Sequence, residues 1–197
     1  SYEYVLQSAR MARLMGGHRV VFHPAAQGKA ERSEAVSLTK ERLKILRDYI
    51  YMNDLSDIKF CPETMGKLAQ IGTVEEIADF CMIDKVFTPC VDFGHVNARE
   101  GGSLKTEEDY AARLDYLIGM LGFDRVKDFH VHFSKIMYSA KGEVKHLTFA
   151  DTVYGPEFAP LAAALKKRGL TPYIVSESDG TQAEDAAEMK KIYNNLP

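Results

Sequence analysis

The sequence contains no apolar run of about 18 residues, the length that a membrane-spanning helix needs. It also shows no charged segment followed by an apolar one at its start, so we expect neither a membrane span nor a signal peptide, and we expect a cytoplasmic protein. An excess of positive charge is likewise missing, because the formal net charge of the 197 residues is −3. We therefore predict no affinity for bulk nucleic acid, so any such contact has to come from a local patch or from metal ions.

Cysteine is scarce. The sequence has three, Cys61, Cys81 and Cys90, and none of them forms a CxxC pair. An odd number of thiols suits a reducing compartment better than a disulfide framework, and the absence of a cysteine cluster argues against a structural zinc site made of thiolates. We expect three buried thiols that pack as small apolar side chains.

The remaining composition is that of an ordinary folded protein, with 46% hydrophobic and 27% charged residues. We expect residues 1–197 to form one globular domain. After an opening helix over residues 4–15, one unit occurs five times: a short strand, a polar loop and a helix. This alternation is typical of a parallel α/β fold. The predicted strands cover residues 19–24, 57–64, 85–95, 126–135 and 171–177.

Two of the following helices begin with a capping box, Thr73 with Glu76 and Thr181 with Glu184. Further helices are expected within residues 27–54, from Thr106 onward and over residues 156–168. We expect the segment 137–152 to form a longer connection between the fourth strand and its helix, which we call the excursion.

Ionisable side chains stand at or just past the end of every predicted strand. On the fourth strand, His130 and His132 are two residues apart and therefore share one face. Because the carboxyl ends of parallel strands form one rim, we expect the whole set to meet there and to bind metal ions. The other members of the set are His23, Glu63, Asp92, His95 and Glu177.

The residue types narrow the choice of metal. Imidazole nitrogens combined with carboxylate oxygens suit Zn²⁺, Mn²⁺ or Fe²⁺, and more than four ligands indicate more than one ion. Glu63 and Glu177 are the candidates to bridge two ions, because their strands flank the strands of Asp92 and His130. His146 could reach the rim from the excursion, and the basic residues Arg99 and Lys135 could meet a phosphate there.

These motifs carry a resemblance. PET at 62–64, VDFGH at 91–95, HVHFSK at 130–135, His146 and VSE at 175–177 resemble, in order, the metal-ligand positions of the endonuclease IV family. That family of apurinic/apyrimidinic endonucleases lies within the xylose-isomerase-like TIM-barrel superfamily, and the resemblance covers the whole chain. It implies a (β/α)8 barrel and up to three metal ions, usually zinc, that hydrolyse the phosphodiester 5′ to an abasic site in DNA.

The resemblance also implies roles for single residues. Glu63 is similar to the bridging glutamate of the fifth barrel strand, and Glu177 to the carboxylate of the eighth; both are expected to be catalytic. His132, Lys135 and Arg99 are expected to support the ligands or to contact substrate. The implied metal ligands are His23, Glu63, Asp92, His95, His130, His146 and Glu177.

The sequence departs from the family pattern in three ways. In the pattern HLNDSK, the asparagine and aspartate are replaced by His132 and Phe133. An expected Asp-x-His reads Val144-Lys145-His146, which leaves Glu143 as a substitute for the aspartate of a third metal site. A complete barrel takes about 250 residues, so we expect only its C-terminal five βα units, strands 4 to 8. The open sheet edge would then need a cover, for example in a homo-oligomer.

Three functions remain open. The first is hydrolysis of DNA at abasic sites with two or three Zn²⁺ ions, for which Mn²⁺ is an alternative. The second is isomerisation or epimerisation of a small sugar or sugar phosphate, with one divalent ion held by Glu63, Asp92, His130 and Glu177. The imidazoles of His23, His95 and His146 favour the first, because sugar isomerisation does not need the extra ions. The third is a metal-binding barrel that has lost catalysis.

Overall fold

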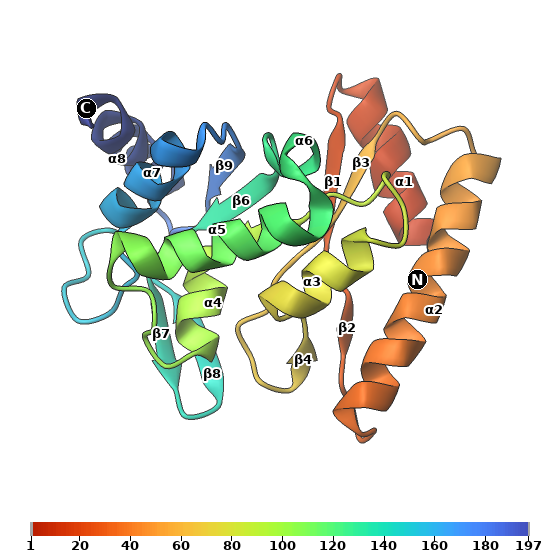
Figure 1. Cartoon of the computed structure of the whole chain (residues 1–197), viewed down its shortest axis with the longest axis horizontal. Coiled ribbons are helices and arrows are strands. Elements are labelled where there is room, and N and C mark those ends of the chain that lie inside the picture. Colours follow the sequence, from red (N-terminus) through yellow and green to blue (C-terminus); the bar gives the residue numbers. More distant parts are fainter. Residues whose placement is uncertain (1, 197) are drawn as a thin grey trace.

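The computed structural model describes residues 2–196 and contains helices and strands in near-regular alternation (Figure 1). The helices are α1 (Tyr2–Leu14), α2 (Arg32–Met52), α3 (Val74–Cys81), α4 (Phe93–Arg99), α5 (Glu107–Leu121), α6 (Phe123–Val126), α7 (Phe158–Arg168) and α8 (Gln182–Asn195). The strands are β1 (Arg19–Phe22), β2 (Ala25–Ala26), β3 (Lys59–Pro62), β4 (Gln70–Ile71), β5 (Cys90–Asp92), β6 (His130–Phe133), β7 (Ile136–Ser139), β8 (Gly142–His146) and β9 (Tyr173–Ser176). Among the described residues, none of the helices has both the length and the apolar character to cross a membrane.

Five of the strands lie side by side and parallel. β1 pairs with β3, and β5, β6 and β9 pair in that order. Parallel bridges between Phe60 and Phe87 and between Glu63 and Cys90 connect the two groups. The order β1-β3-β5-β6-β9 confirms the predicted parallel α/β fold of the TIM-barrel type. No pairing joins β1 to β9 within residues 2–196, so the barrel is not closed in this part of the chain.

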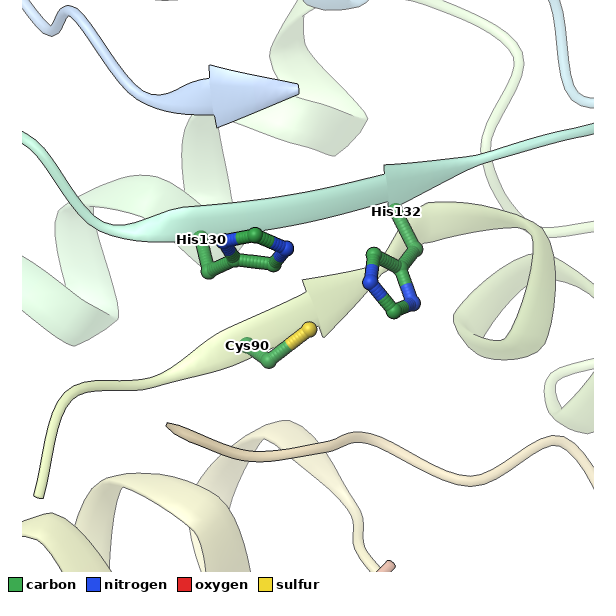
Figure 2. A group of neighbouring side chains, drawn as sticks. All are labelled: Cys90, His130 and His132. Carbon is green, nitrogen blue, oxygen red and sulfur yellow. The ribbon is translucent and has the colours of Figure 1, made fainter. Parts of the chain in front are cut away.

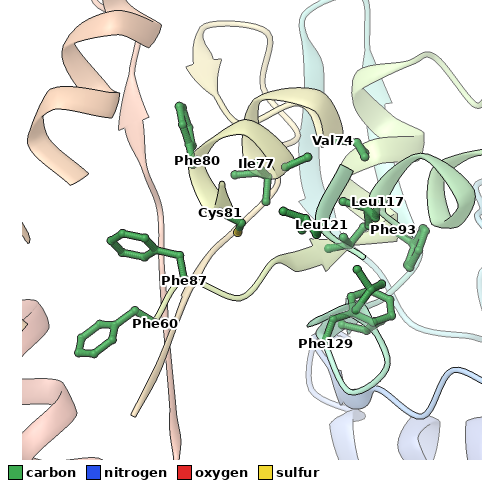
Figure 3. Close-up of a cluster of buried hydrophobic side chains, with 14 of the residues drawn as sticks. Phe60, Val74, Ile77, Phe80, Cys81, Phe87, Phe93, Leu117, Leu121 and Phe129 are labelled. Carbon is green, nitrogen blue, oxygen red and sulfur yellow. The ribbon is translucent and has the colours of Figure 1, made fainter. Parts of the chain in front are cut away.

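The hydrophobic core lies between the sheet and the helices. Phe60 of β3, Val91 of β5 and Phe129 just before β6 are fully buried on this side, in one hydrophobic cluster with Ile77 of α3 and Leu117 of α5. Figure 3 shows part of this cluster. Burying one such side chain contributes roughly 1.5–3 kcal/mol. The other alternate positions point to the inside of the partial barrel, and these are the positions that carry the ionisable groups.

An ionic cluster lies at the amino-terminal ends of the parallel strands. Asp128 accepts hydrogen bonds from Arg19 at 2.8 Å and from Lys59 at 2.7 Å, so it connects β1 and β3 to the start of β6. The guanidinium of Arg19 also lies 4.1 Å from the ring centre of Tyr173 on β9. The barrel interior is therefore tied together below the level of the predicted site.

The third predicted strand is shorter than expected. Only Cys90–Asp92 forms β5, and His95 lies in α4, a helix that the sequence did not predict. The cause is local: the carboxylate of Asp92 accepts a hydrogen bond from the backbone N–H of His95 at 2.8 Å, which makes Asp92 the N-cap of α4. The spacing of Asp92 and His95 is thus also a capping motif.

Two other local predictions were incomplete or wrong. The segment 137–152, expected only as a longer excursion, forms an antiparallel hairpin of β7 and β8 that begins at Ile136. The capping box at Thr73 is present, but the one at Thr181 is absent. The hydroxyl of Thr181 donates to Asp185 at 2.9 Å, and the same carboxylate accepts from the N–H of Phe149, so Asp185 ties α8 to the loop after β8.

Candidate metal centre

Three carboxylates converge where β3, β5 and β9 end. Ligand atoms of Glu63, Asp92 and Glu177, together with one of His95, all lie within 4.8 Å of one another. Glu63 and Asp92 are buried, with 3% and 0% of their surface exposed, while Glu177 is partly open to solvent. The structure therefore brings together four of the residues that the sequence predicted at the rim.

His132 is the β6 histidine at this rim. Its Nδ1 lies 2.9 Å from Oε1 of Glu63 and 3.0 Å from Oε1 of Glu177. His130 lies two residues earlier, about 6.6 Å farther down the strand, and is paired in register with Cys90. We expected His130 among the ligands and His132 in support; the structure instead places His132 against the carboxylates.

The two carboxylate oxygens of Glu63 face different imidazoles. Oε2 lies 3.4 Å from Nε2 of His23, which reaches the rim from the end of β1. Oε1 faces His132 and also lies 3.5 Å from Nδ1 of His95. A carboxylate that bridges two ions needs such a division of its oxygens.

A further group of ligands lies beside this set, where α4 meets the hairpin. Oε2 of Glu143 is 3.5 Å from Nε2 of His95, and its Oε1 is 3.9 Å from Nε2 of His146. Nε2 of His146 is in turn 4.0 Å from Oε2 of Glu177. The structure thus brings Glu143 and His146 to the rim.

Two hydrogen bonds orient these imidazoles. Nδ1–H of His95 donates to the carbonyl of Thr64 at 2.9 Å, and Nδ1 of His146 is hydrogen bonded to the hydroxyl of Ser134 at 2.8 Å. Both rings therefore present Nε2 to the shared space, as metal-ligating histidines do. Sequence reasoning missed the roles of Thr64 and Ser134. The only sign of these roles in the sequence is that Thr64 lies within the PET motif and Ser134 within the HVHFSK motif.

The pKa values reflect this crowding of charges. Burial raises the pKa of Glu63, but hydrogen bonds from His132 and His23 outweigh it and lower the value to about 2. Burial lowers the pKa of His132, whereas Glu177 and Glu63 raise it, with a result of about 10. Burial, aided by Glu63 and Glu177 and opposed by His95, raises the pKa of Asp92 to about 6.

The donor set fits a divalent cation. Oδ2 of Asp92 is buried and has no hydrogen-bond partner among residues 2–196, which is costly for a carboxylate oxygen. Two other carboxylates lie within reach of it, so a positive charge at this point would relieve both the missing contact and the repulsion. Carboxylate and imidazole ligands of this kind suit Zn²⁺ or Mn²⁺.

Arg99 and Lys135 have structural partners. The guanidinium of Arg99 donates to the backbone carbonyls of Met65, Lys67, Leu68 and Gln70, which fastens the loop after β3. Nζ of Lys135 is buried between the carbonyl of Asp151 and a carboxylate oxygen of Glu157, at 2.7 and 2.8 Å. Neither side chain directs its N–H groups toward the candidate metal centre, so neither is part of the proposed site.

Acidic and imidazole side chains gather at the carboxyl ends of the parallel strands, the face on which TIM-barrel enzymes build their sites. The chain belongs to the xylose isomerase-like TIM barrel family, whose model matches residues 1–193. This superfamily consists mostly of enzymes, and its members commonly bind divalent metal ions.

The similar proteins include both endonucleases and epimerases. The uncharacterized protein MJ0133 of Methanocaldococcus jannaschii is 28% identical over 91% of this chain, which spans 64% of that protein. A D-tagatose 3-epimerase-like protein matches with a TM-score of 0.71 at 21% identity, over 98% of this chain and 67% of its own. Endonuclease IV from Thermus thermophilus matches with a TM-score of 0.63 at 19% identity, over 98% and 66%. These structural matches show the fold alone.

Proposed function

We propose that the protein is a metal-dependent phosphodiesterase that cleaves DNA at abasic sites, in the manner of endonuclease IV. The observation that supports this proposal is that the two oxygens of the Glu63 carboxylate face different imidazoles, His23 on one side and His132 on the other. Glu143, His95 and His146 lie beside these residues, so the rim contains more potential ligands than one ion can bind. Hydrolysis of a phosphodiester uses such a multi-ion centre.

We assign two or three Zn²⁺ ions to this centre, with Mn²⁺ as the alternative. When bound, ions of this kind activate water for attack and stabilise the negative charge of the phosphate. Glu63 would hold two ions next to each other, and Asp92, His132 and Glu177 would complete the ligands of one of them. His95, His146 and Glu143 would hold a third.

A cleft of about 600 Å³ next to the centre could admit the substrate. His146 and Glu177 of the candidate centre are among its lining residues, together with Lys145, Asp179 and Gln182. Because Arg99 and Lys135 are engaged elsewhere, Lys145 is the basic side chain in this cleft that can meet a phosphate. Glu177 borders both the centre and the cleft, which places it where a proton can be exchanged with substrate or water.

Epimerisation of a small sugar is the second candidate. Glu63, Asp92, His132 and Glu177 are sufficient to bind a single ion, and two of these carboxylates could move a proton at a substrate carbon. The D-tagatose 3-epimerase-like protein shares this fold, so the fold is compatible with this second reaction. The additional ligands at Glu143, His146 and His23 favour hydrolysis.

The two functions are separated by activity assays on the full-length protein loaded with Zn²⁺ or Mn²⁺. We expect cutting of duplex DNA that carries one abasic site and no cutting of the same duplex with a normal nucleotide there. The variant Glu63→Gln should lower the rate by more than about 100-fold, beyond the loss typical of residues that merely orient a ligand. No cutting at stoichiometric enzyme, together with epimerisation of ketoses in the presence of Mn²⁺, would overturn the assignment.

A further inference from the structure

A second group of metal-ligating atoms lies deeper in the barrel than the carboxylates. The sulfur of Cys90 and one ring nitrogen each of His130 and His132 lie within 4.8 Å of one another. Figure 2 shows both imidazoles leaving β6 on the same side, with the Cys90 sulfur on β5 directed toward them. The three residues are buried, with 0%, 8% and 7% of their surface exposed.

The register of two strands creates this group. Cys90 is paired with His130, and Asp92 is paired with His132. Since alternate residues of a strand share a face, Cys90 lies directly below Asp92, just as His130 lies below His132. A thiol and an imidazole therefore stand one step beneath the carboxylate rim, inside the barrel and away from the helix-covered core.

The deeper histidine has an unsatisfied group. Nδ1 of His130 is buried and has no hydrogen-bond partner among the described residues. Leaving a buried polar atom unpaired destabilises the folded protein, and an apolar side chain in place of an imidazole that served for packing alone would avoid this cost. The imidazole of His130 also has a ring nitrogen within reach of the Cys90 thiol and of a second imidazole, a combination of ligands that is typical of a metal site.

We propose that Cys90, His130 and His132 form a second metal site, which binds a thiophilic divalent ion of the Zn²⁺ type. One thiolate and two imidazoles, with a fourth position open, are a ligand set that zinc uses and that Mg²⁺ and Ca²⁺ do not. Binding breaks the S–H bond of Cys90 and one N–H bond of the His132 imidazolium, forms metal–sulfur and metal–nitrogen bonds and releases both protons to solvent; no electron is transferred.

This site differs from the carboxylate centre in its sulfur ligand, and it would exist whether or not the proposed function holds. His132 contacts both groups, so it also connects the two sites. We therefore expect the deeper ion to affect the position of His132 against Glu63 and Glu177, whatever reaction the rim performs.

The test uses Co²⁺ as the probe, because a cobalt–thiolate bond gives a charge-transfer absorption in the near ultraviolet that oxygen and nitrogen ligands do not give. We expect this absorption in the full-length protein, in Cys81→Ser and in Glu63→Gln, and its loss in Cys90→Ser. Cys81 is a matched control, since it is also a buried free thiol but lies on α3. Co²⁺ bound without this absorption, or an absorption retained in Cys90→Ser, would overturn the proposal.

X-ray absorption at the zinc edge of the unmodified protein keeps the proposal testable if Cys90→Ser does not fold. A sulfur neighbour of zinc is the expected result, and a shell of nitrogen and oxygen alone would contradict it. Glu63→Gln separates this proposal from the previous one. That variant should lose ions at the rim and its phosphodiesterase activity while the thiolate signal remains.

Discussion

Nε2 of His95 lies 3.5 Å from Oε2 of Glu143, although His95 follows β5 and Glu143 lies in β8, 48 positions later. The family pattern has an aspartate in this part of the chain, where this sequence has Val144. The structure brings the neighbouring glutamate into reach of the same imidazoles. Close contact between the hairpin and the loop after β3 makes this possible.

Glu143→Gln tests this role directly. The amide keeps the size of the side chain but removes the charge that attracts a cation, so we expect the loss of about one metal ion per chain. Elemental analysis after extensive dialysis measures this number. Glu41→Gln on the exposed face of α2 is the matched control and should leave the metal content unchanged. Unchanged metal content in Glu143→Gln would exclude Glu143 from the centre.

Gly66→Ala tests the contact that positions Glu143. A Cβ on Gly66 would approach Cβ of Glu143 to 2.7 Å and Cδ2 of His95 to 3.0 Å, so the hairpin has to move away. We expect the same loss of an ion as in Glu143→Gln, measured in the same way. Gly119→Ala on α5 has free space and should raise the stability by about 0.5–1 kcal/mol without changing the metal content. Full metal content in Gly66→Ala would show that the hairpin contact is dispensable.

Proton release on metal binding is the third prediction. Glu177 and Glu63 raise the pKa of His132 to about 10, so the metal-free protein carries a proton there at neutral pH. An ion that binds His132 has to displace this proton, and its apparent affinity should rise about tenfold per pH unit between about pH 7 and 9. Calorimetry in two buffers of different ionisation enthalpy counts the protons. Binding at pH 7 without proton release would mean that the ion does not use His132.

The shifted pKa values of His132 and Glu63 predict how the stability of the metal-free protein depends on pH. The folded-state pKa of His132 lies above its ordinary value of 6.5, so the stabilisation from its ion pairs is complete below pH 6.5 and is lost as the pH rises through about 10. The pKa of Glu63 is lowered from 4.5 to about 2, so its contribution is complete above pH 4.5 and is lost as the pH falls through about 2. Both contributions are therefore complete together between pH 4.5 and 6.5.

The elements of the sheet could be predicted from the sequence because they depend on local patterns. Runs such as 57–64 and 171–177 are short, apolar and followed by helical periodicity, and the capping box at Thr73 is a contact between residues close in sequence. The convergence of Glu63, Asp92 and Glu177 followed from the topology, since parallel strands end at the same rim.

Which side chains reach the candidate site depends on contacts between segments that are distant in the sequence. Whether His130 or His132 reaches the rim is decided by the register of β6 against β5, and motif order alone does not contain this register. Arg99 and Lys135 looked like phosphate contacts because their carbonyl and carboxylate partners come from other loops. Glu143 was a plausible substitute in the sequence, but its approach to His95 requires the hairpin to lie against Gly66.

The central claim is that the carboxylate of Glu63 is shared between two ions. Anomalous diffraction from crystals of the full-length protein grown with Zn²⁺ tests this most directly. We predict two zinc peaks on the two oxygens of Glu63, about 3.5–4 Å apart, one next to His23 and the other next to His132. A single peak at the rim, or the absence of two peaks that both contact Glu63, would contradict the account.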